Sequence, residues 1–300
     1  MKVLYINTDR GYGIYQIGLL FLDIIKLISP IHTINVYTTQ CCNQAKKYIP
    51  EHYDLVIINE YNPGCIDDII PKFKNTPIIN IAHSQHNTPN EVLTIGLNHE
   101  TNWKKGIFSL DFVPGNIWEN KHKSRKGTMM ACRICKEKIP LELLPKDVDI
   151  YGPVLDYDLV EKIKYSGFCT PLELVDMYNQ YSQLLVISNT ECLCMPIREA
   201  LLCGCTPVVY DPDRVYTSKI SDYIQYYNEP LRELKPFPYR FEDMVLQFLF
   251  YLRAITGRKL ILKKDNKTNV TYLHSQRDRE LYTYNIFNED LLWKTIENNG

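Results

Sequence analysis

One stretch of the sequence decides the fold, Ser188–Val209, which reads SNTECLCMPIREALLCGCTPVV. Pro196 suits the first turn of a helix, because the N–H that proline lacks would be unpaired there in any case. Gly204 can end that helix in the left-handed conformation, which glycine adopts without a steric penalty. The stretch therefore predicts a helix over Pro196–Cys203 that joins two buried strands, the repeating unit of a parallel sheet.

Two glutamates, Glu191 and Glu199, stand on either side of the predicted start of this helix. A helix N-terminus presents unpaired backbone N–H groups and the positive end of the helix dipole, which together favour a phosphate. Carboxylates accept hydrogen bonds and so suit the vicinal hydroxyls of a sugar. We therefore expect phosphate and sugar recognition at the same place.

The alternation of strands and helices extends to both sides of this stretch. In the second half of the chain we expect strands at Thr128–Ile134, Val148–Tyr151, Leu184–Ser188 and Thr206–Tyr210, and a further helix at Leu172–Tyr181. In the first half we expect strands at Lys2–Thr8, Thr33–Thr38, Asp54–Asn59 and Pro77–Ala82, with a helix at Ile14–Ile28. Each half thus reads as an α/β, Rossmann-like domain with a parallel sheet, and a ligand is expected in the cleft where the two domains face each other.

A change in composition separates the two halves. It begins at Val113–Asn116 and continues through the basic run Lys121–Lys126, which we interpret as a solvated linker. The expected domains are residues 1–122, an N-terminal acceptor-side domain, and 123–284, a C-terminal donor domain. A last helix in 285–300 is expected to pack back on the N-terminal domain, and Phe241–Thr256 should form a long helix before it.

The segment from about residue 128 to 210 resembles the retaining nucleotide-sugar glycosyltransferases of glycosyltransferase family 4, which have the GT-B fold. Their Glu-x7-Glu signature, followed by small residues and a Pro-Val-Val strand, corresponds to Glu191 through Val209. Arg133 and Lys138 reproduce the Arg-x4-Lys spacing of the family. Three further matches are Ile150–Pro153, Tyr165–Phe168 and, in the first half, a glycine loop with a histidine after a later strand. The chain departs from the family at Cys192, Cys194 and Arg198, where two glycines and an apolar residue are usual.

The resemblance implies a role for each matching residue. Arg133 and Lys138 would neutralise the leaving diphosphate, and Glu199 would accept hydrogen bonds from the ribose. Glu191 and the backbone of Cys192, Leu193, Cys194 and Met195 would orient the donor sugar, while Phe168 and Cys169 would contact the base. On the opposite domain, Gly11 and Gly13 would approach the donor, and His83 would touch the sugar, with His86 as the competing candidate.

Composition limits the remaining functions. The chain has 300 residues and a formal net charge of -1, so it has no net basic field that would draw it to nucleic acid or anionic membrane. The apolar start is too short for a signal peptide, so we expect a cytoplasmic protein with reduced thiols. Cys132 and Cys135 could form half of a zinc site, but histidines at matching spacing are missing, and we expect neither a metal nor a resident cofactor.

The expected function is transfer of a sugar from a nucleotide diphosphate sugar, most simply a UDP-sugar, with retention of configuration. The acceptor stays open between a glycan, a lipid, a protein and a modified DNA base. The alternatives are a nucleotide-sugar epimerase of the same fold and a non-catalytic sugar-nucleotide binding protein. Membrane contact through Met244–Leu252 and the basic residues after it is the less favoured interpretation of that segment.

Overall fold

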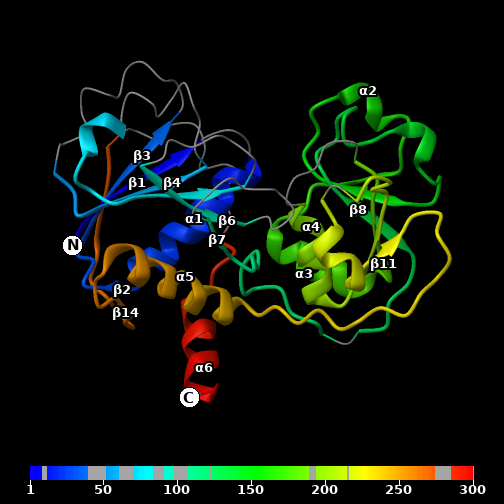
Figure 1. Cartoon of the computed structure of the whole chain (residues 1–300). Coiled ribbons are helices and arrows are strands. Elements are labelled where there is room, and N and C mark those ends of the chain that lie inside the picture. The colour runs from blue at the N-terminus through cyan, green and yellow to red at the C-terminus, as the bar shows by residue number, and fades with distance from the viewer. Residues whose placement is uncertain are drawn as a thin grey trace. The chain divides into compact units, whose positions relative to one another are not determined.

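The chain forms two compact units, Met1–Phe112 together with Tyr239–Gly300, and Val113–Pro238 (Figure 1). The computed structural model describes residues 1–8, 12–39, 52–60, 70–83, 91–97, 107–121, 123–188, 194–214, 216–273 and 285–299. The second unit begins at Val113, where the composition changes, and not at residue 123. Residues 239–284 also differ from the expectation, because they belong to the first unit and not to the second.

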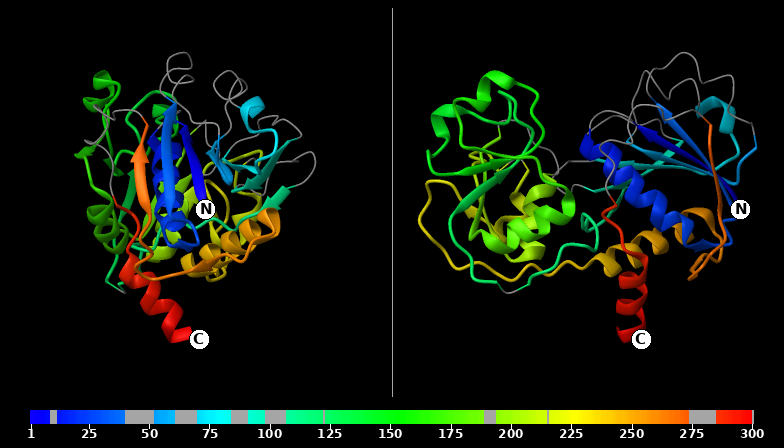
Figure 2. Two further views of the ribbon diagram at one scale, coloured as in Figure 1. Left: turned by 90° about the vertical axis from the view of Figure 1, so that its left-hand side faces the viewer. Right: turned by 180° about the vertical axis from the view of Figure 1, so that it is seen from behind.

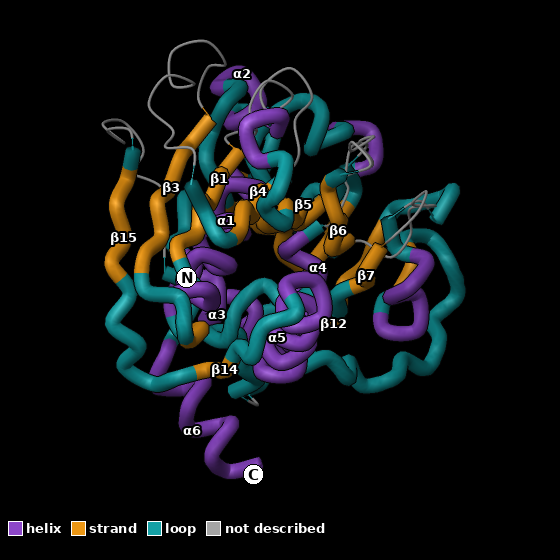
Figure 3. The backbone as a smooth tube through the Cα atoms, turned by 60° about the vertical axis from the view of Figure 1, so that its left-hand side comes forward, coloured by secondary structure: helices purple, strands orange, loops and turns teal. Residues whose placement is uncertain are grey.

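Within the described residues, the first unit is built on a seven-stranded sheet with the order β15-β3-β1-β4-β5-β6-β7 (Figure 3). All of its strands pair in parallel. The strands are β1 (Lys2–Thr8), β3 (Thr33–Thr39), β4 (Leu55–Asn59), β5 (Ile78–Ala82), β6 (Val92–Gly96), β7 (Ile107–Ser109) and β15 (Asn269–Tyr272). The four strands predicted in this half are present, each within one residue of the predicted bounds, whereas β6, β7 and β15 were not predicted.

The described helices of the first unit are α1 (Tyr12–Lys26), η2 (Ile70–Phe73), α5 (Phe241–Thr256) and α6 (Glu289–Asn299) (Figure 2). A two-stranded antiparallel sheet pairs β2 (Ile28–Ser29) with β14 (Ile261–Leu262). The ring centroids of Phe21 on α1 and Phe248 on α5 lie 4.9 Å apart. This contact, together with the pairing of β15 with β3, explains why the chain returns to the first unit after Pro238, a return that no local pattern announces.

The core of the first unit follows from the alternation of side chains along β1. Leu4 and Ile6 point to one face, where they join an apolar cluster that includes Val56 and Ile58 of β4. On the other face, the buried Tyr5 hydroxyl donates a hydrogen bond to the Gly18 carbonyl of α1 (2.6 Å). Both faces of the parallel sheet are therefore covered, as its nearly continuous apolar strands require.

The second unit repeats this architecture with a six-stranded parallel sheet, in the order β10-β9-β8-β11-β12-β13 among the described residues. Its strands are β8 (Thr128–Ala131), β9 (Asp149–Tyr151), β10 (Tyr165–Gly167), β11 (Gln183–Val186), β12 (Thr206–Val209) and β13 (Gln225–Tyr226). Its helices are η3 (Leu141–Leu143), α2 (Tyr157–Val160), α3 (Pro171–Gln180), α4 (Met195–Cys203) and η4 (Ser218–Tyr223). The chain thus has two Rossmann-like units, as expected.

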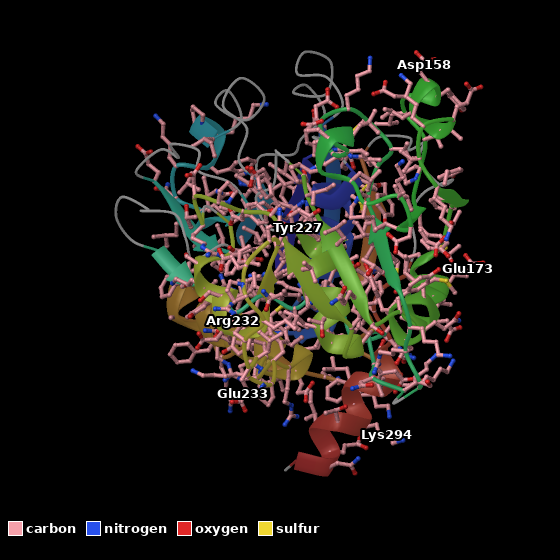
Figure 4. The ribbon with its side chains drawn as sticks, turned by 90° about the vertical axis from the view of Figure 1, so that its right-hand side faces the viewer. Asp158, Glu173, Tyr227, Arg232, Glu233 and Lys294 are labelled. Carbon is pink, nitrogen blue, oxygen red and sulfur yellow. The ribbon has the colours of Figure 1, made fainter. Side chains whose placement is uncertain are left out.

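The helices α3 and α4 begin and end where local chemistry directs. Thr170 and Glu173 form a capping box at the start of α3, with Glu173 at the surface (Figure 4). Gly204 ends α4 with φ 77°, the left-handed conformation predicted for it. A Cβ atom there would lie 2.5 Å from the Asn120 side chain, so the close approach of this segment also requires glycine.

Two residues of the basic run, Lys121 and Arg125, bond to α3 and α4, which the prediction of a solvated linker did not include. Lys121 pairs with Asp176 of α3 (2.9 Å). The Arg125 guanidinium donates to the Cys203 carbonyl at the end of α4 (2.5 Å) and to Asn179 (3.0 Å). Arginine suits this position because its planar fork reaches several acceptors at once.

No helix within the described residues is long and apolar enough to cross a membrane.

Candidate functional site

The polar residues predicted for the donor site of the second unit follow the carboxyl ends of its strands. Arg133 comes after β8, Phe168 and Cys169 come after β10, and α4 follows β11. Because these strands are parallel and neighbouring in the sheet, their carboxyl ends lie along one edge, where ligands of open α/β sheets bind. The topology therefore places Arg133, Phe168, Cys169 and the start of α4 on the same edge.

The loop after β9 packs directly against the extension of β8. Gly152 has φ 146°, and a Cβ atom on it would lie 1.8 Å from the Cys132 carbonyl oxygen. The Cys132 N–H donates to the Tyr151 carbonyl (3.0 Å) and the Ile134 N–H to the Pro153 carbonyl (2.9 Å). Only glycine fits at position 152, which brings the two backbones together at the edge of the sheet.

Arg133 and Lys138 belong to one tight turn after β8. The Cys135 N–H donates to the Arg133 carbonyl (3.0 Å), and the Lys138 N–H donates to the Cys135 carbonyl (3.0 Å). The apolar side chains of this turn, Ile134 and Ile139, are buried, whereas Arg133 is exposed. The spacing of four residues between the two cations thus places them on one turn at the sheet edge.

Glu199 lies in the second turn of α4 and is only 6% exposed. The hydroxyl of Tyr178, a fully buried residue of α3, donates to Glu199 Oε2 (3.1 Å). Burial raises the pKa of Glu199 to about 8, because a carboxylate removed from water is destabilised, and the hydrogen bond from Tyr178 offsets part of that effect. The hydrogen bond from Tyr178 therefore holds Glu199 in one orientation. Because burial destabilises the charged carboxylate, a ligand that donates hydrogen bonds to it would favour the ionised form.

Tyr178 is itself held in place by aromatic packing against Trp118, with ring centroids 6.0 Å apart. Burial also raises the pKa of the Tyr178 hydroxyl well above its usual value, so this group keeps its proton and acts as a donor. No local sequence pattern identifies this partner, because Tyr178 lies 21 residues before Glu199 on a different helix.

Cys194 begins α4 in the left-handed conformation, with φ 39° and ψ 72°. A residue with a Cβ atom is strained there, and glycine would not be. The backbone at this position therefore has the geometry that glycine favours, although the residue is a buried cysteine.

The other described cysteines of the second unit, among them Cys135, Cys203 and Cys205, form no disulfide bond. Burial raises the pKa of Cys203 and of Cys205 to about 12, so both stay protonated at neutral pH. Among the described residues no group of three or more His, Cys, Asp or Glu side chains is arranged to hold a metal ion.

A second polar cluster occupies the carboxyl ends of β1, β4 and β5 in the first unit. His83 follows β5 and is 3% exposed. Its Nε2 lies 2.7 Å from Asn59 Oδ1, and its backbone N–H donates to Glu60 Oε2 (2.6 Å). The Asn59 amide nitrogen donates in turn to Asn7 Oδ1 (2.8 Å) and to the Ile14 carbonyl of α1 (2.9 Å).

The imidazole of His83 is neutral near physiological pH. Burial lowers its pKa to about 3, because the charged form loses its hydration. A group with so low a pKa is a poor proton acceptor at neutral pH, so His83 is suited to orienting a ligand by hydrogen bonding and not to acting as a general base.

The sequence pattern indicates His83 but not Asn7, Asn59 and Glu60, which form the hydrogen-bonded cluster around it. A signal for them exists, since each is a polar residue at the end of an apolar strand. Glu60 has the further feature of φ 62°, a strained left-handed conformation that persists only where the surroundings enforce it. Gly13 lies in the first turn of α1, which begins two residues earlier than predicted.

Several of the predicted site residues lie outside the described part of the chain. These are Gly11, Glu191, Cys192 and Leu193, together with the competing candidate His86.

Comparison with known proteins identifies the fold through solved structures. No protein-family model matches the sequence, and no curated protein matches it. The glycosyltransferase AviGT4, involved in avilamycin A biosynthesis, aligns with a TM-score of 0.56 and 10% identity over 87% of this chain and 99% of its own. A glycosyltransferase from Rickettsia africae ESF-5 aligns with a TM-score of 0.55 and 13% identity over 99% and 97%.

Anabaena HepE, solved in complex with UDP, aligns with a TM-score of 0.51 and 15% identity over 70% of this chain and 81% of its own. The chain spans 50% of the length of the chain that it matches in the GtfA/B complex. The two Rossmann-like units and these alignments together show that the chain has the GT-B fold.

Proposed function

We propose that this protein is a glycosyltransferase that moves a sugar from a nucleotide diphosphate sugar, most simply a UDP-sugar, to an acceptor with retention of configuration. The observation that carries the proposal is the buried pair Tyr178–Glu199 (3.1 Å), which joins α3 to α4, the helix that follows β11. A buried carboxyl with one oxygen engaged by a tyrosine is a specific acceptor for ligand hydroxyls, and its place in the sequence is the second glutamate of the Glu-x7-Glu pattern.

The fold supports this proposal independently of the sequence pattern. Two structures that align over most of the chain, AviGT4 and the Rickettsia africae protein, are described as glycosyltransferases. HepE was solved with UDP, which makes uridine the first nucleoside to test.

In the proposed reaction, the bond between the anomeric carbon and the diphosphate oxygen breaks, and negative charge grows on the diphosphate. Arg133 and Lys138 would neutralise this charge, and the N-terminus of α4 would add backbone N–H donors. Such fixed positive groups can do the work that a divalent cation does elsewhere, so we propose a metal-independent transfer. The acceptor oxygen would then bond to the anomeric carbon on the face that the diphosphate left, and the proton of the acceptor hydroxyl would pass to the departing diphosphate.

The remaining residues would bind and orient the donor. Glu199 would accept hydrogen bonds from the ribose hydroxyls, and Phe168, 43% exposed after β10, would contact the base. Glu191 and the backbone of Cys192–Met195 would orient the sugar. In the first unit, Gly13 and His83 would approach the donor at the carboxyl ends of β1 and β5.

A ligand screen followed by product analysis tests the proposal. Thermal unfolding should shift upward with UDP and one UDP-sugar, since a ligand at 100 times its dissociation constant stabilises by about 2.7 kcal/mol. The stabilising donor is then incubated with pools of glycan, lipid, peptide and hydroxylated-base acceptors, with and without EDTA. Mass spectrometry should find a sugar adduct of one acceptor, and NMR should show the donor's anomeric configuration retained.

Other outcomes would replace the proposal. An altered sugar released without any acceptor would identify an epimerase, and donor binding without hydrolysis or transfer would identify a binding protein. An inverted anomer would overturn retention, and loss of transfer with EDTA would overturn metal independence. Failure of every nucleotide diphosphate sugar to bind would overturn the proposed donor.

A further inference from the structure

The hydrogen-bond chain behind His83 has a defined direction, which sets the chemistry of the imidazole. At its far end lie the backbone carbonyls of Ile14 and Tyr15 in the first turn of α1, which can only accept hydrogen bonds. The Asn59 amide nitrogen donates to the Ile14 carbonyl (2.9 Å), and the Asn7 amide nitrogen donates to the Tyr15 carbonyl (3.4 Å). Both carboxamides are therefore oriented with the nitrogen towards α1, because a backbone carbonyl cannot act as a hydrogen-bond donor.

The orientation of Asn59 determines which nitrogen of His83 carries the proton. Because the amide nitrogen of Asn59 also donates to Asn7 Oδ1 (2.8 Å), its own Oδ1 is the atom that lies 2.7 Å from His83 Nε2. A carboxamide oxygen only accepts, so Nε2 must carry the proton that is shared in this short contact. In a neutral imidazole, Nδ1 then has a lone pair and accepts a hydrogen bond.

The geometry around the cluster prevents rearrangement. Asn59 is fully buried and Asn7 is 1% exposed. α1 approaches so closely that a Cβ atom on Gly18 would lie 2.0 Å from Asn7 Oδ1 and 2.5 Å from Asn59 Nδ2. On the other side, Glu60 accepts the backbone N–H of His83 (2.6 Å), so two consecutive residues at the end of β4 hold both the ring and the backbone of this histidine.

We propose that Asn59 is a positioning residue that fixes His83 as the Nε2–H tautomer, so that Nδ1 accepts a hydrogen bond from a hydroxyl of a bound sugar. The part of this inference that concerns the sugar rests on the proposed function. The part that concerns the tautomer rests on the hydrogen bonds alone. Asn59 acts through His83 and needs no contact with substrate.

The tautomer can be read directly by NMR. The chain has seven histidines, so protein labelled with ¹⁵N-histidine is compared with a His83→Gln variant to assign the His83 signals. In the wild-type protein at neutral pH, we expect a protonated Nε2 and an unprotonated Nδ1. In Asn59→Ala we expect the two nitrogen shifts to move towards each other as the tautomers mix, while Asn59→Asp, which keeps an acceptor oxygen, should retain the Nε2–H form.

A wild-type spectrum that shows the Nδ1–H tautomer or a doubly protonated ring would overturn the proposal, even if neither variant folds. An unchanged His83 signal in folded Asn59→Ala would also overturn it. Asn35→Ala is the matched control, since it removes a buried carboxamide of the same sheet that donates to Tyr53 (2.8 Å). This control should leave the His83 signals in place.

Steady-state kinetics test the consequence for transfer. Asn59→Ala and His83→Ala should each lower kcat by about 10- to 100-fold, as expected when a substrate-orienting group is displaced. The double variant should lose no more than either single variant, and the Kd for UDP should stay within about twofold of wild type. Multiplicative losses in the double variant would show independent roles and contradict the proposal. A wild-type protein that transfers no sugar would defeat the proposed function, whereas the NMR spectrum would still decide the tautomer.

Discussion

At the level of single residues, the feature with the strongest consequences is the buried carboxyl of Glu199. This carboxyl accepts a hydrogen bond from the Tyr178 hydroxyl, which lowers its pKa, but burial has the larger effect. Its pKa is therefore governed by burial, which raises it from 4.5 to about 8. Ionisation of Glu199 in the folded protein therefore lowers the free energy of unfolding.

This pKa predicts a pH-dependent cost to folding. Between pH 4.5 and 8 the unfolded chain releases the Glu199 proton and the folded chain keeps it, so stability falls as pH rises, by up to about 1.4 kcal/mol per pH unit. His83 has the opposite effect on stability, mainly below pH 6.5. There the unfolded chain binds a proton at this histidine and the folded chain does not, so stability rises as pH rises. From pH 6.5 to 8 the N-terminal amine, whose pKa burial lowers from 8.0, also contributes, so the comparison with Glu199→Gln is needed to separate the contribution of Glu199.

Urea unfolding of wild type and Glu199→Gln at several pH values checks this. The advantage of the Gln variant should grow steadily from pH 6.5 to 8, because glutamine has no proton to lose. A constant difference between the two proteins across this window would show that Glu199 titrates normally.

The left-handed backbone of Cys194 predicts an inverted order of stability at that position. Cys194→Gly and Cys194→Ala remove the same sulfur atom, so their difference reports the backbone alone. At φ 39° we expect Gly to be more stable than Ala by about 1 kcal/mol. At the control Cys203, the last residue of α4, Ala should be more stable than Gly by up to about 1 kcal/mol, because helical residues favour Ala over Gly.

Chemical denaturation of these four variants gives the comparison. If Ala were the more stable residue at both positions, Cys194 would not have the conformation described here.

At the level of elements, the approach of α1 to β1 and β4 is fixed by Gly18. Ala is normally about 1 kcal/mol better than Gly in a helix interior. Here its Cβ atom would lie 2.0 Å from Asn7 Oδ1, so Gly18→Ala should destabilise the protein by about 1 to 3 kcal/mol instead. Adding Asn7→Ala should recover part of this loss, because it removes the oxygen that the new methyl group meets.

Thermal and urea unfolding of the two single variants and the double variant measure this coupling. Strictly additive effects would contradict the proposed contact, since residues that clash are expected to show an interaction energy.

Sequence patterns predicted the elements wherever local periodicity decides them. The helix Phe241–Thr256 has the predicted bounds, and the end of α4 at Gly204 is confirmed by its φ of 77°. The edge strand β15 was missed because Asn269–Tyr272 is short and largely exposed, so it lacks the apolar run by which buried strands are recognised. The domain boundary after Pro238 was missed because it depends on contacts with α1 and β3, more than 200 positions away.

The candidate site was predictable to a similar degree. Arg133 and Glu199 stand in an ordered motif, so the sequence alone is enough to propose them as site residues. The residues that hold Glu199 and His83 cannot be recognised in this way, because Tyr178 and Asn59 meet these partners only through packing between elements. The hydrogen-bond partner of a buried polar residue depends on which elements pack together, and this cannot be deduced from a single sequence.

At the level of the whole molecule, we expect substitutions in the two units to affect transfer in different ways. Arg133→Ala in the second unit should lower kcat more than it raises KM, because charge on the diphosphate grows as the bond breaks. Loss of one such fixed group typically costs about 10²- to 10³-fold in kcat. His83→Ala in the first unit should also lower kcat, yet it should leave nucleotide affinity unchanged.

Initial rates with the identified donor, beside UDP titrations of the same proteins, check this assignment. Wild-type turnover in both variants would show that the two units do not act on one donor.

The central claim, that the second unit holds a nucleotide diphosphate through Glu199, is tested most directly by isothermal titration calorimetry with UDP and the matching UDP-sugar. Glu199→Gln should weaken both ligands to a similar degree, because a ribose contact does not depend on the sugar, whereas Glu191→Gln should weaken mainly the UDP-sugar. Glu161→Gln, an exposed glutamate of the same unit, should bind both ligands like wild type. If Glu199→Gln binds UDP as tightly as wild type, the nucleotide does not contact Glu199 and the proposed donor site is contradicted.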